Sequence, residues 1–152
     1  MTGDIPSRRG RVVGIDLGSR RIGVAVSDSA RTMALPRTTL VRTADAERDR
    51  RALIELVLEE EAVTVVVGLP LSLDGSRGRA ALEAADEAAV LGALLAPHSV
   101  EVELFDERLT TVTAHQVLAA GGARERARRK VVDQAAAAVM LGAWLEATGG
   151  RS

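Results

Sequence analysis

Cysteine is absent from this chain of 152 residues, so the chain can form neither a disulfide nor a thiolate metal site. Any bound metal ion would have to be held by carboxylates, carbonyl oxygens or the two histidines. His98 and His115 lack the spacing of metal ligands, and we expect both at the surface. The lack of cysteine therefore directs attention to the acidic residues and to cations such as Mg²⁺, which prefer oxygen ligands.

Long apolar runs and a secretion signal are also missing. No apolar segment approaches the roughly 20 residues that span a bilayer. The basic N-terminal segment 1–11 lacks the apolar stretch of a signal peptide. The length suits one domain with a substantial core. We therefore expect a cytoplasmic protein with a disordered leader at 1–10, a single domain at 11–147 and a flexible tail at 148–152.

An excess of basic residues is missing too, since the formal net charge is −1. A nucleic-acid-binding domain usually carries a strongly basic balance. Phosphate contacts, however, depend on local charge more than on the total. The net charge therefore neither indicates nor excludes a nucleic-acid partner.

Hydrophobic periodicity divides the chain into three leading strands, followed by alternating helices and strands. The predicted strands span 11–16, 21–28, 34–41, 62–68 and 100–105. The predicted helices span 45–61, 77–96 and 131–147, with a further helix from about residue 110 and a loop at 121–130. Short turns favour antiparallel pairing of the first three strands, and Pro36 favours a sheet edge for the third. Later strand–helix–strand units make parallel pairs, so we predict an α/β fold with a mixed five-stranded sheet and helices on both faces.

Asp16 ends the first predicted strand, in the sequence GIDLG (14–18). An ionised aspartate among apolar neighbours is costly unless it is paired or bound to a metal. Gly18 permits a turn with positive φ and a close approach of a ligand to the backbone. Asp-x-Gly is also a common turn at strand ends, so the motif alone leaves a purely structural role open.

Asp106 and Glu107 follow the strand 100–105 directly, at the carboxyl end where open α/β sheets usually bind their ligands. A functional pair of acids at this place is one interpretation. The other is that both are surface acids, one of them paired with Arg108.

Asp133 is predicted to begin the last helix. Ala136, Ala137, Met140 and Trp144 follow at helical spacing, so Asp133 stands above a face that packs against the sheet. Its structural alternative is favourable placement at a helix N-terminus, which stabilises by about 0.3–1 kcal/mol. Carboxylates from two strand ends and a helix start could together hold one or two divalent cations, which hydrolyse phosphodiesters in line.

Four ordered stretches resemble the YqgF family, also called RuvX: GIDLGSRRIGVAVSD (14–28), VVVGLPLSLDGSRG (65–78), FDERLTT (105–111) and VDQAAA (132–137). Element order and motif spacing agree from about residue 11 to residue 147. The resemblance implies an RNase H-like fold of the RuvC type and a cytoplasmic bacterial nuclease that uses Mg²⁺ or Mn²⁺. Activities proposed for the family are maturation of the 5′ end of pre-16S rRNA and resolution of Holliday junctions.

By the same resemblance, Asp16, Glu107 and Asp133 would be the catalytic and metal-binding acids. We rank Glu107 above Asp106, whose side chain faces the opposite way if the strand persists. The strand 62–68 carries no acid at its end, in contrast to other RNase H-like nucleases. The acid that follows the strand 100–105 would have to substitute for it.

Several basic residues lie near these acids in sequence and could contact the phosphates of structured RNA or branched DNA. Together with Gly18, the candidates for nucleic-acid binding are Arg20, Arg21, Arg77, Arg108, Arg124, Arg128, Arg129 and Lys130. Each of these residues could instead belong to a solvated surface. Phe105 and Trp144 are the only aromatic residues, and we expect both to be buried, so base stacking is not the expected mode of recognition.

Two other function classes stay open. An ATP-binding domain of the actin/Hsp70 type also begins with an Asp-x-Gly hairpin, although its cleft needs two facing halves and this chain has the length of one. A non-catalytic nucleic-acid-binding regulator could keep the fold without the activity. The sequence does not decide between RNA and DNA, one metal ion and two, or a monomer and a homodimer.

Overall fold

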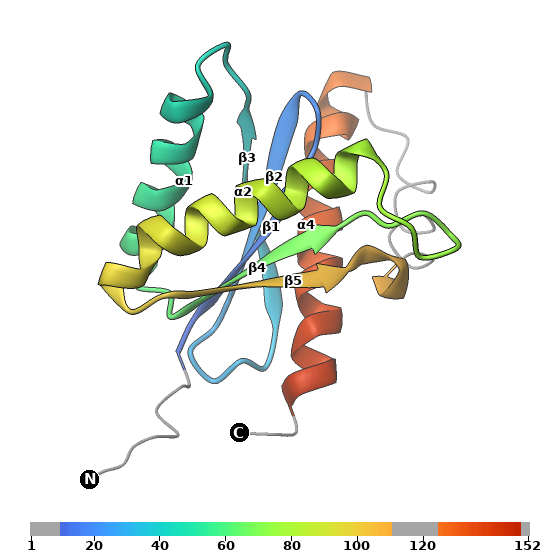
Figure 1. The fold of residues 1–152 in the computed structure, drawn as a ribbon. Coiled ribbons are helices and arrows are strands. Elements are labelled where there is room, and N and C mark those ends of the chain that lie inside the picture. Colours follow the sequence, from blue (N-terminus) through green and yellow to red (C-terminus); the bar gives the residue numbers. More distant parts are fainter. Residues whose placement is uncertain (1–9, 111–124, 150–152) are drawn as a thin grey trace, which may run out of the picture.

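The computed structural model describes residues 10–110 and 125–149. Their centre is a five-stranded sheet with the order β3-β2-β1-β4-β5 (Figure 1). The strands span Val12–Leu17 (β1), Arg21–Ser27 (β2), Ala34–Val41 (β3), Thr64–Leu69 (β4) and Glu101–Asp106 (β5). β1, β2 and β3 pair antiparallel, whereas β4 is parallel to both β1 and β5. The predicted mixed sheet with three antiparallel leading strands is confirmed.

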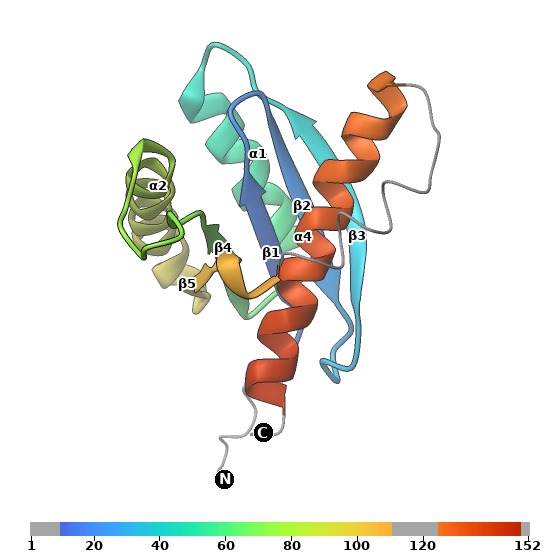
Figure 2. The same ribbon diagram turned by 90° about the vertical axis from the view of Figure 1, so that its right-hand side faces the viewer.

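Helices cover both faces of this sheet, as predicted. α1 (Ala46–Glu59) and α2 (Arg79–Leu95) lie on one face, and α4 (Glu125–Gly149) crosses the other (Figure 2). Two short 3₁₀ helices, Ala96–His98 (η2) and Glu107–Thr110 (η3), flank β5. Among the described residues, no helix is long and apolar enough to cross a membrane.

β3 forms one edge of the sheet, which is the position that Pro36 predicted. Pro36 pairs with Ala25 and Thr38 pairs with Val24, so the register shifts between these two pairs. Proline cannot donate a backbone hydrogen bond to a neighbouring strand, and an edge strand tolerates this loss.

Alternation of side chains along β1 builds a separate apolar core on each face. Val13 and Ile15 are fully buried with residues of α1 and α2, whereas Val12 is fully buried against α4. The core under α4 consists of Val12, Ala25, Val66, Ala137, Met140, Leu141, Trp144 and Leu145. Because successive side chains of a strand point to opposite faces, Asp16 shares the α4 face with Val12.

The start of α4 differs from the prediction. The helix begins at Glu125, so the predicted loop 121–130 is wrong from residue 125 onward. Arginine, alanine, glutamate and lysine are strong helix formers, and here they continue the helix despite their charge. Asp133 is consequently the ninth residue of α4. A helix dipole acts on charges in the first turn, and Asp133 lies beyond that turn. Its predicted place at the start of the helix was therefore wrong.

Three predicted segments extend beyond the described residues. They are most of the leader at 1–10, the helix expected from about residue 110 and the end of the tail at 148–152. α4 continues to Gly149, and the hydroxyl of Thr148 donates a hydrogen bond to the carbonyl of Trp144 at 2.9 Å.

Candidate active site

Asp16 is held at the end of β1 by a tight turn into β2. The amide of Gly18 donates to the carbonyl of Arg21 at 2.9 Å, which closes the turn. A Cβ atom at position 18 would lie 2.6 Å from that carbonyl oxygen, so the turn requires glycine. Asp16 itself lies opposite Gly23 of β2 in the sheet register. The Asp-x-Gly motif thus forms a turn, as its sequence predicted, although Gly18 does not adopt the positive φ that was expected. It also directs a carboxylate onto the α4 face.

Glu107 reaches the same place from the β5 edge of the sheet. β5 ends at Asp106, and Glu107 opens η3. Its side chain lies over Gly68 of β4, where an added Cβ atom would clash with the Glu107 carboxylate. The strand β4, which carries no acid of its own, therefore contributes empty space that the carboxylate from β5 fills. Glycine near the end of an apolar strand is a signal of such a close approach, although it does not reveal what approaches.

Asp16 and Glu107 form a partly buried carboxyl pair. Burial raises the pKa of Asp16, a hydrogen bond from Glu107 lowers it in part, and the nearby charge of Asp133 raises it further. Burial also raises the pKa of Glu107 to about 7, with further contributions from the charge of Asp16, their shared hydrogen bond and the charge of Asp106. The pair therefore holds a proton near neutral pH, with Glu107 as the hydrogen-bond donor to Asp16.

Asp133 approaches this pair from α4. Its backbone carbonyl lies directly over Gly23, where a Cβ atom could not be accommodated, so the helix sits close to β2. Its carboxylate Oδ2 accepts a hydrogen bond from Nε of Arg21 at 2.8 Å. The structure thus brings the three predicted acids into one neighbourhood, with two of them in direct contact and the third ion-paired beside them.

The acids have the chemistry of a site for a hard divalent cation. They offer carboxylate oxygens only, which suits Mg²⁺ or Mn²⁺. A cation would also relieve the repulsion that raises the pKa of Glu107. In the described ranges 10–110 and 125–149, however, no three potential ligands converge closely enough to enclose an ion as they stand. The Asp16–Glu107 pair is the part of the site that is already assembled.

Asp106 does not join the acids. It accepts hydrogen bonds from the guanidinium of Arg108 at 2.7 and 3.0 Å and from the Arg108 backbone amide at 2.9 Å. The ion pair with Arg108 lowers the pKa of Asp106. Arg108 also donates to the carbonyl of Leu73 at 3.2 Å, which ties the loop after β4 to the end of β5. The two residues therefore match the alternative in which Asp106 is an acid paired with Arg108.

The predicted nucleic-acid contacts occupy several different places. Arg20 and Arg77 are exposed, Arg20 in the turn between β1 and β2 and Arg77 in the loop before α2. Arg21 and Arg108 are engaged with acids of the protein. Residues 128–130 lie on the N-terminal part of α4, and Arg124 lies outside the described residues.

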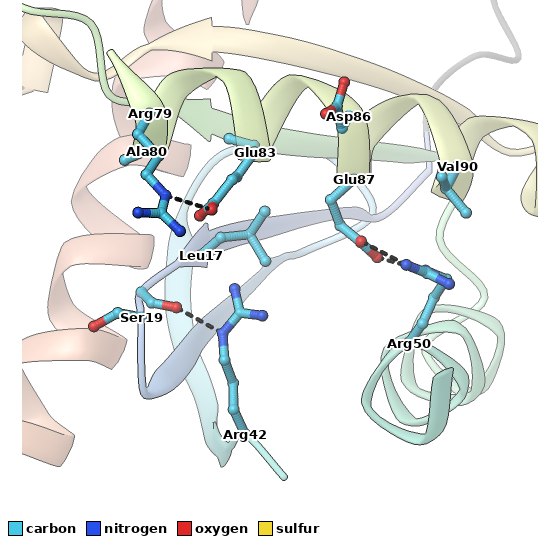
Figure 3. Close-up of a pocket in the computed structure, with 12 residues that line it drawn as sticks. Leu17, Ser19, Arg42, Arg50, Arg79, Ala80, Glu83, Asp86, Glu87 and Val90 are labelled. Carbon is cyan, nitrogen blue, oxygen red and sulfur yellow. Dashed lines mark hydrogen bonds and ion pairs between the residues drawn. The ribbon is translucent and has the colours of Figure 1, made fainter. Parts of the chain in front are cut away.

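A cleft of about 770 Å³ lies between the β1–β2 turn, α1 and α2 (Figure 3). Its walls are Leu17, Gly18, Ser19, Arg42, Arg50, Arg79, Ala80, Glu83, Ala84, Asp86, Glu87 and Val90. Arg50 forms two hydrogen bonds with Glu87 at 2.7 and 2.8 Å, and Nε of Arg42 donates to the carbonyl of Gly18 at 2.6 Å. Sequence reasoning missed this cleft, because its residues follow no motif. None of the three acids lines it, although Gly18 of the β1–β2 turn does.

Comparison with known proteins agrees with this arrangement. The family model for RuvX, described as a Holliday junction resolvase, matches residues 10–147. A protein of Mycobacterium leprae (strain Br4923) named "Putative pre-16S rRNA nuclease" is 48% identical over 143 residues, which is 94% of this chain and 76% of that protein. A protein of the same name from Mycolicibacterium paratuberculosis (strain ATCC BAA-968 / K-10) is 49% identical over 138 residues, 91% of this chain and 81% of that protein.

Solved structures share the fold. RuvC of Thermus thermophilus, in complex with a Holliday junction substrate, matches with a TM-score of 0.53 and 16% identity over 92% of this chain and 96% of that chain. The yeast mitochondrial Holliday junction resolvase Ydc2 matches with a TM-score of 0.56 and 10% identity over 90% of this chain and 78% of that chain. The predicted RNase H-like fold of the RuvC type is confirmed. Because the family model and both bacterial relatives extend over at least 90% of its length, this chain belongs to the RuvX family of nucleases.

Proposed function

We propose that this chain is a divalent-metal-dependent endonuclease that hydrolyses phosphodiester bonds in structured nucleic acid, and that its main substrate is the 5′ end of pre-16S rRNA. The observation that carries the proposal is the partly buried Asp16–Glu107 carboxyl pair, in which the pKa of Glu107 is raised to about 7. Burying two carboxyl groups together is costly, and such sites are typical of function rather than stability. The names of the two bacterial relatives support RNA as the substrate.

In this proposal, Asp16 and Glu107 would hold Mg²⁺ or Mn²⁺, with Asp133 completing the acid set. A bound ion of this kind activates a water molecule and stabilises the leaving oxygen of a phosphodiester. The protein itself must first release the proton that Asp16 and Glu107 share, because a metal ligand has to be deprotonated. The chain also supplies the surface for substrate, for which we propose Gly18, Arg20, Arg77 and the basic residues 124 and 128–130. The same proposal places the protein in the cytoplasm, where precursor rRNA is made.

Holliday junction resolution is the second candidate, and the description of the matching family model favours it. Resolution of a four-way junction needs two cuts and therefore two paired active sites, whereas trimming of one RNA end needs a single site. A homodimer would suit the first activity and a monomer the second.

Cleavage by purified wild-type protein and by the Asp16→Asn variant tests both candidates. The substrates are an RNA that carries the 5′ end of pre-16S rRNA and a four-way DNA junction, each with Mg²⁺ or with EDTA. We expect wild type to cleave the RNA only with Mg²⁺. Asp16→Asn should be at least about 10³-fold slower, since a catalytic metal supplies several kcal/mol of transition-state stabilisation.

Asp86→Asn is the control, because Asp86 is an exposed acid of α2, on the face of the sheet opposite α4. It should cleave like wild type. Equal cleavage by wild type and Asp16→Asn, or undiminished cleavage in EDTA, would refute the proposal. Preferential cleavage of the junction would instead favour the second candidate.

A further inference from the structure

Arg21 was expected to contact substrate phosphate, and the structure gives it another partner. Its Nε donates to Oδ2 of Asp133 at 2.8 Å, across 112 positions of sequence. Both side chains are about three-quarters buried, with 26% and 27% of their areas exposed. Such a pair is more strongly held than an exposed ion pair, because less water screens the two charges.

The backbone around Arg21 is itself well fixed. Arg21 is the first residue of β2, its carbonyl closes the turn with Gly18, and it lies opposite Val41 in the register with β3. Gly23, two residues later and on the same face, leaves the room that the backbone of Asp133 occupies. One strand thus supplies both the space and the hydrogen-bond donor for the same aspartate.

The pairing leaves part of the carboxylate available. Oδ2 of Asp133 is engaged by Arg21, and Oδ1 makes no hydrogen bond to any residue that the structure describes. The backbone of Asp133 lies directly over Gly23, which is paired with Asp16 in the register of β1 and β2. Arg21 therefore compensates the negative charge of Asp133 while it orients that carboxylate beside the other two acids.

We infer that Arg21 is a positioning residue, which holds Asp133 through Oδ2 so that the same carboxylate can serve the metal site of Asp16 and Glu107. This inference rests on the proposed function, since it assumes that these acids bind a divalent cation. A partner that orients a ligand in this way typically contributes about 10–100-fold to metal affinity or activity. Arg21 then acts on the metal through Asp133 and does not act on the substrate directly.

Mn²⁺ titration of the full chain by calorimetry tests the inference, with Arg21→Gln and Arg21→Lys compared to wild type. We expect Arg21→Gln to weaken Mn²⁺ binding by about 10-fold or more and to lower kcat with little change in KM. Arg21→Lys should recover part of the affinity, because it keeps the positive charge but lacks the planar Nε donor. It also covers the case in which Arg21→Gln fails to fold.

Arg50→Gln is the matched control. Arg50 of α1 and Glu87 of α2 form an ion pair of 2.7 Å with 21% and 22% of their side-chain areas exposed, on the face of the sheet opposite α4. Arg50→Gln should leave Mn²⁺ affinity within about twofold of wild type. The midpoint of thermal unfolding should fall in both Arg50→Gln and Arg21→Gln, because each removes an ion pair.

Two other results would overturn the inference, and they are distinguishable. Unchanged Mn²⁺ affinity in both Arg21 variants, together with weaker substrate binding in EDTA and a shallower salt dependence, would identify a phosphate contact instead. If wild type itself fails to bind Mn²⁺, the proposed metal site fails and the role of Arg21 fails with it. Mn²⁺ binding that is weaker in the Arg21 variants and unchanged in Arg50→Gln would support both the metal site and the positioning role of Arg21.

Discussion

Asp106 and Glu107 are neighbours in the chain and occupy opposite electrostatic environments. The carboxylate of Asp106 accepts hydrogen bonds from Arg108 and has a lowered pKa. The carboxyl group of Glu107 is turned into the molecule over Gly68, meets the like charge of Asp16 and has a pKa raised to about 7. One residue of separation is enough, because side chains at the end of a strand alternate between the two faces of the sheet.

The difference distinguishes a carboxylate that supports structure from one that is available for chemistry. A surface ion pair is satisfied by its own partner and contributes little to stability. A buried pair of acids is unfavourable in the protein without a cation, and it would gain much from binding one. Charge in a buried, incompletely compensated site therefore marks the candidate active site more clearly than the acidic sequence itself does.

The largest expected effect separates the two neighbours directly. Glu107→Gln should lower kcat for RNA cleavage by about 10³-fold, because it removes a proposed metal ligand. Asp106→Asn should stay within a few-fold of wild type, since that side chain faces Arg108. Single-turnover cleavage with saturating Mg²⁺ measures both. A larger loss in Asp106→Asn than in Glu107→Gln would reverse the assignment of the second acid.

Gly68→Ala should displace the Glu107 carboxyl group without unfolding the chain. The three atoms nearest to an added Cβ all belong to the Glu107 side chain, which can move away. A displacement of about 1 Å can cost about 10²-fold in rate. Gly142→Ala is the control, because nothing lies within 4 Å of its added Cβ. In helix α4 it should leave kcat unchanged and stabilise by about 0.5–1 kcal/mol. Equal rates for Gly68→Ala and wild type would contradict the close contact.

The pair should also make metal-free stability depend on pH. The pKa of Glu107 is raised from 4.5 to about 7, so the folded chain binds more protons than the unfolded chain between these values. The free energy of unfolding should therefore fall as pH rises from about 4.5 to 7. The expected loss is about 1–2 kcal/mol, after allowance for partial solvent access.

Urea unfolding in EDTA at pH 5 and pH 8 measures this loss. The comparison of wild type with Glu107→Gln isolates the contribution of Glu107 from that of the other acids. We expect the variant to lose less stability over this interval than wild type. Identical losses in the two proteins would show that the folded-state pKa of Glu107 is close to its ordinary value.

The smallest effect is expected for Arg108→Gln, which removes the charged partner of Asp106. Because the Arg108 side chain is exposed, the midpoint of thermal unfolding should change by less than about 2 °C. Cleavage should fall by only a few-fold, through loss of the hydrogen bond to the carbonyl of Leu73. A loss as large as that of Glu107→Gln would show that the loop after β4 acts directly in catalysis.

Much of this arrangement could be predicted from local patterns. Asp16 follows from an apolar strand that ends in Asp-x-Gly, and the preference for Glu107 follows from strand alternation. The same reasoning was wrong about the start of α4, because a run of arginines was interpreted as a loop although its residues favour a helix. Sequence reasoning also assigned Arg21 to substrate. It could not reveal the ion pair with Asp133, because the two residues lie 112 positions apart in the chain.

The sequence by itself predicted the five strands, the antiparallel pairing of the first three and the edge position of the third, because these depend on periodicity and on residues close together in the chain. The resemblance of its motifs to a known family added the three candidate acids. Only the tertiary structure decided that Glu107 fills the space over Gly68 and that Asp133 is paired with Arg21. It also decided that Asp16 and Glu107 meet in a partly buried place that raises the pKa of both, while Asp106 is paired with Arg108. The pKa of a carboxyl group depends on burial and on charges within a few ångströms, and folding brings those charges together from distant parts of the chain.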